Sequence, residues 1–205
     1  MSALLQAWEL MQAGGPVMWP LMALSLWLWS LVLAKLLWLW EAGREGLDLS
    51  QAVDHLRSGQ VPRPRGPRSR ALAVFMLLRR GHTKSDLLWW EVAVRRQAPR
   101  LWRHVNTVLV LAAVAPLLGL LGTVTGMIDT FQVIRFFGTS NAQALSAGIS
   151  QALITTQTGL LVAIPGLFAG YFLRRQTRKL QQGLDSFQQG LDRWLKSGEA
   201  EQCCV

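Results

Sequence analysis

The sequence predicts an all-α membrane protein with three spans, whose long helices extend into a cytoplasmic helical domain. Of its 205 residues 51% are hydrophobic and only 16% are charged, whereas a soluble domain carries about 25% charged residues. The charge deficit falls in three long apolar runs, as transmembrane spans require. Between Arg103 and Arg174 the only charged residues are Asp129 and Arg135.

The distribution of basic residues predicts the topology. Of the 21 Lys and Arg residues, 13 lie between Glu41 and Arg103 and six follow Leu173, whereas Arg135 alone lies between the second and third runs. By the positive-inside rule we expect the N-terminus and the 135–144 link to lie outside. The 41–104 loop and the residues after Leu173 should be cytoplasmic. We therefore expect the net charge of +9 to face anionic lipids or the cytoplasm, and no nucleic acid.

Residues 1–16 predict a short amphipathic helix on the outer membrane surface, and residues 17–40 predict the first span. We expect no cleaved signal peptide, because no basic segment precedes this apolar run and the run is too long. Lys35 is the only charged residue in the span and lies near its cytoplasmic end. It either snorkels to the membrane surface or pairs with a carboxylate of a partner.

Residues 41–104 predict a cytoplasmic loop with helices of its own. Asp48 and Gln51 are spaced as a capping pair for a helix that ends near Ser58. The Pro- and Arg-rich segment 60–70 is interpreted as a linker. Residues 71–80 and 85–103 predict two further helices.

The cytoplasmic tail, residues 174–205, predicts a helix over 176–197 with an apolar residue at every third or fourth position. This face should pack on the loop helices or on neighbouring subunits; it comprises Leu180, Leu184, Phe187, Leu191 and Trp194. Cys203 and Cys204 are interpreted as reduced residues of a disordered end.

The second span (105–134) and the third span (145–173) each carry a stripe of small residues on one face. Such stripes let membrane helices approach closely. They comprise Ala112, Ala115, Gly119, Gly122 and Gly126 in the second span, and Gly148, Ala152, Thr156, Gly159, Ala163, Gly166 and Gly170 in the third. Pro116 and Pro165 interrupt the backbone hydrogen bonds of these spans, which neighbouring helices can compensate.

Hydroxyl and amide groups gather at comparable depth in both spans. An intramembrane threonine usually bonds a carbonyl of its own helix. So many polar groups on adjacent helices instead suggest a lining that faces a pore or a partner helix. The group comprises Thr123, Thr125, Ser150, Gln151, Thr155, Thr156, Gln157 and Thr158.

Neither span has a titratable group near its centre, and Asp129 lies close to the outer end of the second span. Threonine hydroxyls do not ionise at physiological pH. If protons or ions pass along this lining, the titratable carrier must therefore come from another chain. The sequence calls for a partner with an intramembrane carboxylate.

The sequence contains no catalytic constellation that would make it an enzyme. His55, His82 and His104 lack metal-ligand spacing, and no phosphate-binding loop is present. We therefore expect no cofactor and no metal.

Three segments resemble the MotA/TolQ/ExbB proton-channel family, most closely its ExbB branch: WPLMALSLWLWSLVLAKL (19–36), APLLGLLGTVTGMIDTF (115–131) and GISQALITTQTGLLVAIPG (148–166). The resemblance covers all three spans in order. It implies a multi-pass protein of the bacterial inner membrane with a periplasmic N-terminus, assembled as a homopentamer.

The resemblance also implies partners and site residues. Five subunits would surround an ExbD-like single-span protein that supplies an Asp carboxylate, and proton flow would drive work on a TonB-like protein. Thr123 and Thr156 would line the pore. Many ExbB-like proteins have Glu where this chain has Gln151. Because a glutamine amide does not exchange a proton as a carboxylate does, the partner's carboxylate must carry the proton.

Two rival interpretations remain open. A TolQ-like role would energise a TolA-like partner and envelope integrity by the same mechanism. A passive membrane scaffold would keep the small-residue stripes but would not need the hydroxyls.

Overall fold

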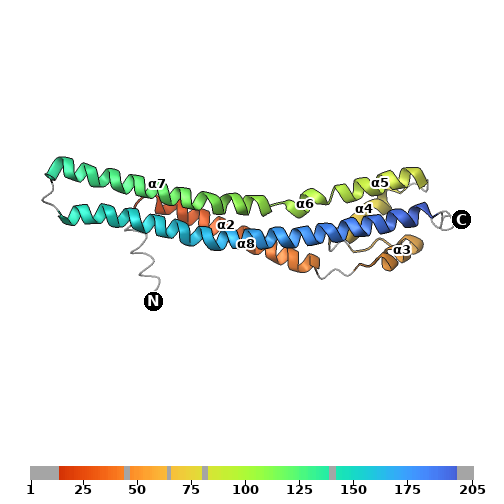
Figure 1. Ribbon diagram of the computed structural model, residues 1–205. Helices are drawn as coiled ribbons and strands as arrows, with labels where there is room; N and C mark the ends of the chain where they lie inside the picture. Colours follow the sequence, from red (N-terminus) through yellow and green to blue (C-terminus); the bar gives the residue numbers. More distant parts are fainter. Residues whose placement is uncertain (1–13, 44–46, 64–65, 80–82, 139–141, 198–205) are drawn as a thin grey trace. The chain divides into compact units, whose positions relative to one another are not determined.

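The computed structural model describes residues 14–43, 47–63, 66–79, 83–138 and 142–197 (Figure 1). These residues form seven helices and no strands, which confirms the all-α prediction. The helices are α2 (Met18–Gly43), α3 (Leu49–Ser58), α4 (Pro67–Leu78), α5 (Thr83–Arg95), α6 (Ala98–Trp102), α7 (Val105–Phe137) and α8 (Ala142–Lys196).

Three long helices, those that contain α2, α7 and α8, are apolar enough to cross a membrane, as predicted. Most of the predicted N-terminal helix lies outside the described residues, as do Cys203 and Cys204.

The chain divides into two compact units. We call the first the span unit; it comprises the residues up to Leu33 together with Val105–Tyr171. We call the second the loop unit; it comprises Ala34–His104 together with the residues from Phe172 onward.

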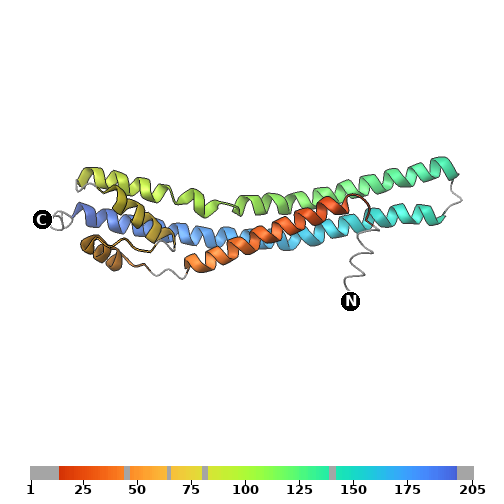
Figure 2. The same ribbon diagram turned by 180° about the vertical axis from the view of Figure 1, so that it is seen from behind.

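In the span unit, α7 and the first part of α8 lie side by side and antiparallel in both views (Figures 1 and 2). Leu24 of α2 packs in one buried cluster with Ala115 of α7 and Ala163 of α8. Pro116 and Pro165 both lie inside helices that continue past them.

In the loop unit, α3 forms the capping box that its sequence predicts. The Asp48 carboxylate accepts a hydrogen bond from the Leu49 amide at 2.8 Å, and the Gln51 side chain accepts one from the Asp48 amide at 3.4 Å. Gly59 ends α3 in the left-handed conformation, with φ of 68°.

Two loop predictions are wrong, and proline is the reason in both cases. Pro67 starts α4 from within the segment interpreted as a linker, because proline is favoured at the first helical position. The helix predicted over 85–103 is divided into α5 and α6. Pro99 has no amide hydrogen for an interior helical bond but fits the first turn of α6.

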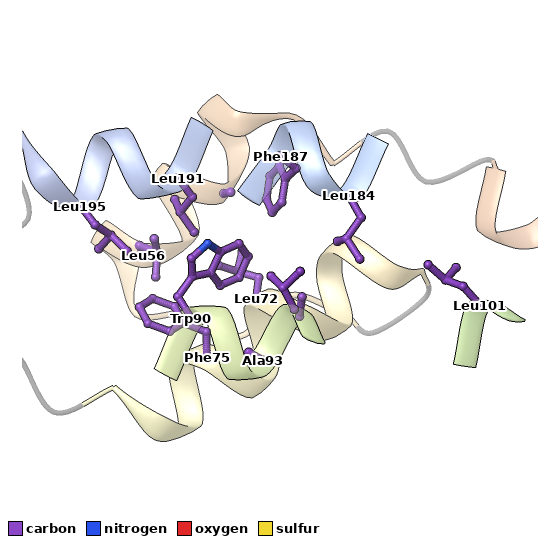
Figure 3. Packing of buried hydrophobic residues seen from close by; sticks show 13 residues of the cluster. Leu56, Leu72, Phe75, Trp90, Ala93, Leu101, Leu184, Phe187, Leu191 and Leu195 are labelled. Atoms are coloured by element: carbon purple, nitrogen blue, oxygen red, sulfur yellow. The ribbon is translucent and has the colours of Figure 1, made fainter. Parts of the chain in front are cut away.

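The loop unit is built around Trp90, whose side chain is fully buried. Its ring meets Phe75 of α4 edge-on at a centroid distance of 5.5 Å, and Phe187 of α8 at 5.9 Å (Figure 3). The predicted apolar face of the tail packs here, through Leu184, Phe187 and Leu191 with Leu180 and Trp194 at the margin. The C-terminal part of α8 is thereby joined to the loop helices.

We expect Trp90→Ala to destabilise the loop unit by about 3–5 kcal/mol, because it removes a fully buried aromatic side chain and leaves a cavity. Thermal unfolding of the detergent-solubilised protein measures this. Leu88→Ala, on the same helix but 65% exposed, is the control and should change the melting temperature little. Equal melting temperatures for both variants would contradict the assignment.

Candidate functional site

The small-residue stripes of α7 and α8 face each other inside one chain. A Cβ atom added to Gly159 would lie 2.9 Å from the Ala115 carbonyl oxygen and 3.1 Å from the Gly119 Cα atom. One added to Gly126 would lie 2.9 Å from the Gly148 carbonyl oxygen. Since the obstructing atoms belong to the backbone, the two helices touch main chain to main chain.

The contact extends along both helices. A Cβ on Gly119 would meet the Thr155 carbonyl oxygen at 3.2 Å, and one on Gly122 would overlap the Thr155 side chain. A Cβ on Gly166 would approach Ala112 of α7 and also Leu28 of α2. The stripe on α8 therefore contacts both other spans of the unit.

All five threonines of the predicted lining have hydroxyls that bond carbonyls of their own helix. Thr123 donates to the Leu120 carbonyl oxygen at 2.7 Å, and Thr125 donates to that of Gly122 at 2.9 Å. Thr158 donates to the Ile154 carbonyl oxygen at 2.8 Å. All three side chains are partly exposed in the single chain, so their oxygens remain accessible as acceptors.

Thr156 is the hydroxyl that reaches across to the neighbouring helix. Its oxygen lies 3.3 Å from the Gly119 carbonyl oxygen of α7 and 3.2 Å from the Ala152 carbonyl oxygen of its own helix. Gly119 precedes Thr123 by one helical turn. The structure thus places the Thr156 hydroxyl about one turn from Thr123.

Thr155 is fully buried, with no exposed surface, and this corrects its expected place in the lining. Its hydroxyl donates to the Ala152 carbonyl oxygen at 2.9 Å, and its side chain fills the space that Gly122 leaves open. Thr155 therefore packs between α7 and α8 and does not face a pore.

Thr130 belongs to the same interface and was missed by the sequence reasoning. It is 4% exposed, donates to the Gly126 carbonyl oxygen at 2.8 Å, and packs against Gly148. Its signal was present, because it follows Gly126 by four residues and so extends the small-residue stripe of α7 by one turn.

Gln151 lies against Gly15, at the turn before α2. Gly15 has φ of 69°, and a Cβ there would overlap the Gln151 amide nitrogen. Gln151 was expected in the pore lining together with the threonines. The structure brings its amide to the start of the first span, and its place in a pore lining stays a prediction.

Lys35 does not snorkel to an exposed position in the described chain, whereas its pairing with a partner's carboxylate stays a prediction. Its side chain is buried, with 6% exposed, and its Nζ atom donates to the Leu101 carbonyl oxygen at 2.8 Å. Nζ also lies 3.5 Å from the Arg100 carbonyl oxygen and 4.2 Å from the centre of the Trp38 ring. Within the described chain it forms no ion pair. A lysine beside the last carbonyls of α6 interacts favourably with the helix dipole.

The site offers polar groups but no set of metal ligands. Within the described parts of the chain no group of three His, Cys, Asp or Glu residues could hold a metal ion. Asp129 is exposed on α7, one residue before the buried Thr130.

Comparison with known proteins matches residues 78–186 to the MotA/TolQ/ExbB proton channel family. The chain is 34% identical over 168 residues to the biopolymer transport protein ExbB-like 1 of Synechocystis sp., an alignment that covers 74% of the chain and 64% of the relative. It is 30% identical over 154 residues to the biopolymer transport protein ExbB of Neisseria gonorrhoeae, covering 70% of the chain and 69% of the relative.

The Tol-Pal system protein TolQ of Haemophilus influenzae is 31% identical over 104 residues, which cover 51% of the chain and 46% of the relative. The chain therefore spans less than two thirds of the length of the Synechocystis and Haemophilus relatives.

We expect Gly159→Ala to destabilise the packing of α7 on α8 by about 1–3 kcal/mol, because its methyl group would meet backbone atoms that cannot rotate away. Gly170→Ala is the matched control on α8, since its methyl group meets the end of the flexible Leu109 side chain. Thermal unfolding in detergent should show a larger loss for Gly159→Ala. A larger loss for the control would contradict backbone contact at Gly159.

We expect Gly15→Ala to be destabilising for two separable reasons. The left-handed backbone costs roughly 1–2 kcal/mol for a residue with a Cβ, and the methyl group would also overlap Gln151. Gly59→Ala has the same φ but open space around it, so it measures the backbone cost alone. Thermal unfolding is measured for both variants and for Gly15→Ala/Gln151→Ala. The double variant should regain only the stability that the overlap with Gln151 removes, and should keep the backbone cost.

Proposed function

The chain belongs to the MotA/TolQ/ExbB proton channel family, and from this premise we propose that it is an ExbB-like subunit of a proton-driven motor. With an ExbD-like partner it converts proton motive force into mechanical work on a TonB-like protein, for active transport across the outer membrane. Two of the relatives described above are named for ExbB and one for TolQ, which favours the ExbB assignment.

Members of this family are bacterial inner-membrane proteins rather than enzymes, and three apolar helices fit that location. We propose a periplasmic N-terminus and a cytoplasmic C-terminus. The support is the concentration of Lys and Arg in the 41–104 loop and after Leu173, which keeps those segments on the cytoplasmic side.

One observation carries the mechanism: α7 and α8 pack through their small residues and leave threonine hydroxyls accessible without any acid or base at mid-span. Thr123 is partly exposed, and the Thr156 hydroxyl lies one turn away. Between Arg103 and Arg174 the only charged residues are Asp129, near the outer end of the second span, and Arg135, in the link that follows it. The proton carrier in this proposal is therefore a carboxylate on a helix of the partner.

The hydrogen bonds of these threonines favour one protonation state of that carboxylate. The Thr123 hydroxyl hydrogen is engaged by the Leu120 carbonyl oxygen, so its oxygen can accept but not donate without breaking that bond. A protonated carboxylic acid can donate to it, whereas an ionised carboxylate needs a donor. Thr123 in this rotamer therefore accommodates the neutral acid better than the anion.

Proton flow would then drive stepwise movement. In the proposed homopentamer, protonation neutralises the partner's carboxylate, which can then pass the apolar wall between one Thr123/Thr156 pair and the next. One charge crossing 100 mV releases about 2.3 kcal/mol. A few protons per step exceed a typical allosteric coupling of about 1–3 kcal/mol and suffice to favour one packed arrangement over its neighbour.

A TolQ-like role is the second candidate, favoured by the similarity to the TolQ protein of Haemophilus influenzae. The same spans would then act on a TolA-like protein. Co-purification separates the two, because the client that comes down with the chain is TonB-like in one case and TolA-like in the other.

We expect Thr123→Val together with Thr156→Val to lower proton flux through the reconstituted complex with its partner by at least about tenfold. Valine keeps the shape of threonine but removes the oxygen that receives the acid. Proton flux into vesicles under an imposed membrane potential, and TonB-dependent uptake in cells, are the measurements.

Thr125→Val is the matched control. Thr125 is two residues from Thr123, so it lies on a different face of α7, and its hydroxyl likewise bonds a carbonyl of its own helix. Serine at positions 123 and 156 should restore flux. Unchanged flux and uptake in the double valine variant would favour a passive scaffold.

A further inference from the structure

A pocket of about 410 Å³ in the loop unit is lined by five basic residues and two apolar ones. None of its described lining residues is acidic. They are Ala34, Lys35 and Trp38 of α2, Arg70 of α4, Arg100 of α6, and Arg103 and His104 of the link to α7.

Lys35 forms the buried wall of this pocket. Its hydrogen bonds go to neutral carbonyl oxygens, so they satisfy its donors without cancelling its charge. A buried ammonium without a carboxylate is costly, and an anion close by lowers that cost. The Trp38 ring, whose centre lies 4.2 Å from Nζ, offsets only part of the cost of burying this charge.

Exposed basic side chains form the outer wall of the pocket. Arg100, Arg103 and His104 are all exposed, and Arg103 and His104 lie in the short link after α6. Guanidinium groups bind phosphate oxygens in a bidentate manner, so two of them beside a lysine suit a phosphate group.

We propose that this pocket binds the phosphate of an anionic phospholipid headgroup. The phosphate chemistry alone would also admit a free phosphate, but the surroundings favour a lipid. Ala34 and Trp38 belong to an apolar helix, and Leu37 beside them is 67% exposed, which provides a surface for acyl chains. The proposal rests on the membrane position of α2 and does not depend on proton transport.

The test is binding of phosphatidylglycerol to the full-length chain in its native assembly, measured by native mass spectrometry and by competition in phosphatidylcholine nanodiscs. We expect phosphatidylglycerol to be retained over phosphatidylcholine. Arg100→Gln together with Arg103→Gln should weaken that retention by about tenfold or more, since each basic residue contributes substantially to attraction of an anionic headgroup.

Arg95→Gln together with Arg96→Gln is the control, because it removes the same charge from exposed positions outside the pocket. Arg100→Lys with Arg103→Lys keeps the charge but loses the bidentate geometry, so it should weaken binding less than the glutamine variant does, which shows that the site still folds. Equal losses in the pocket and control variants, or equal retention of both lipids, would overturn the proposal. If inorganic phosphate fully displaces the lipid, the pocket binds free phosphate and the lipid assignment is wrong.

Discussion

The arrangement of the span unit depends on direct main-chain contact between α7 and α8. In a membrane, apolar side chains do not drive helices together, because lipid tails solvate them equally well. Association depends on close packing instead, and Gly119 and Gly159 permit it by presenting backbone to backbone. A larger residue at either position would separate the helices and move every group attached to them.

The positions of the hydroxyls follow from that contact. Thr155 and Thr130 lie inside the interface, where their hydroxyls bond local carbonyls and their side chains fill the space beside Gly122 and Gly148. Thr156 lies at its margin and reaches the Gly119 carbonyl oxygen, while Thr123 stays accessible. The same threonine-rich pattern thus serves both packing and the proposed transfer of a proton.

The loop unit is held together differently, by a buried cluster of large aromatic and aliphatic side chains. Trp90 joins α4, α5 and α8 through Phe75 and Phe187. Lys35 joins α2 to the end of α6 by binding carbonyl oxygens, and this buries a positive charge beside Arg100 and Arg103. The charged pocket therefore follows from the hydrogen bond by which Lys35 attaches the end of α2 to α6.

The sequence by itself determined the class, the spans and the faces that pack, because hydrophobic periodicity and small-residue spacing are local and act through one helix at a time. Its errors were also local: Pro67 starts a helix and Pro99 divides one. Only the tertiary structure decided which threonine is buried, that Gln151 meets Gly15, and that Lys35 binds the end of α6. Those outcomes depend on which residues of distant segments meet, which no periodicity within a single helix records.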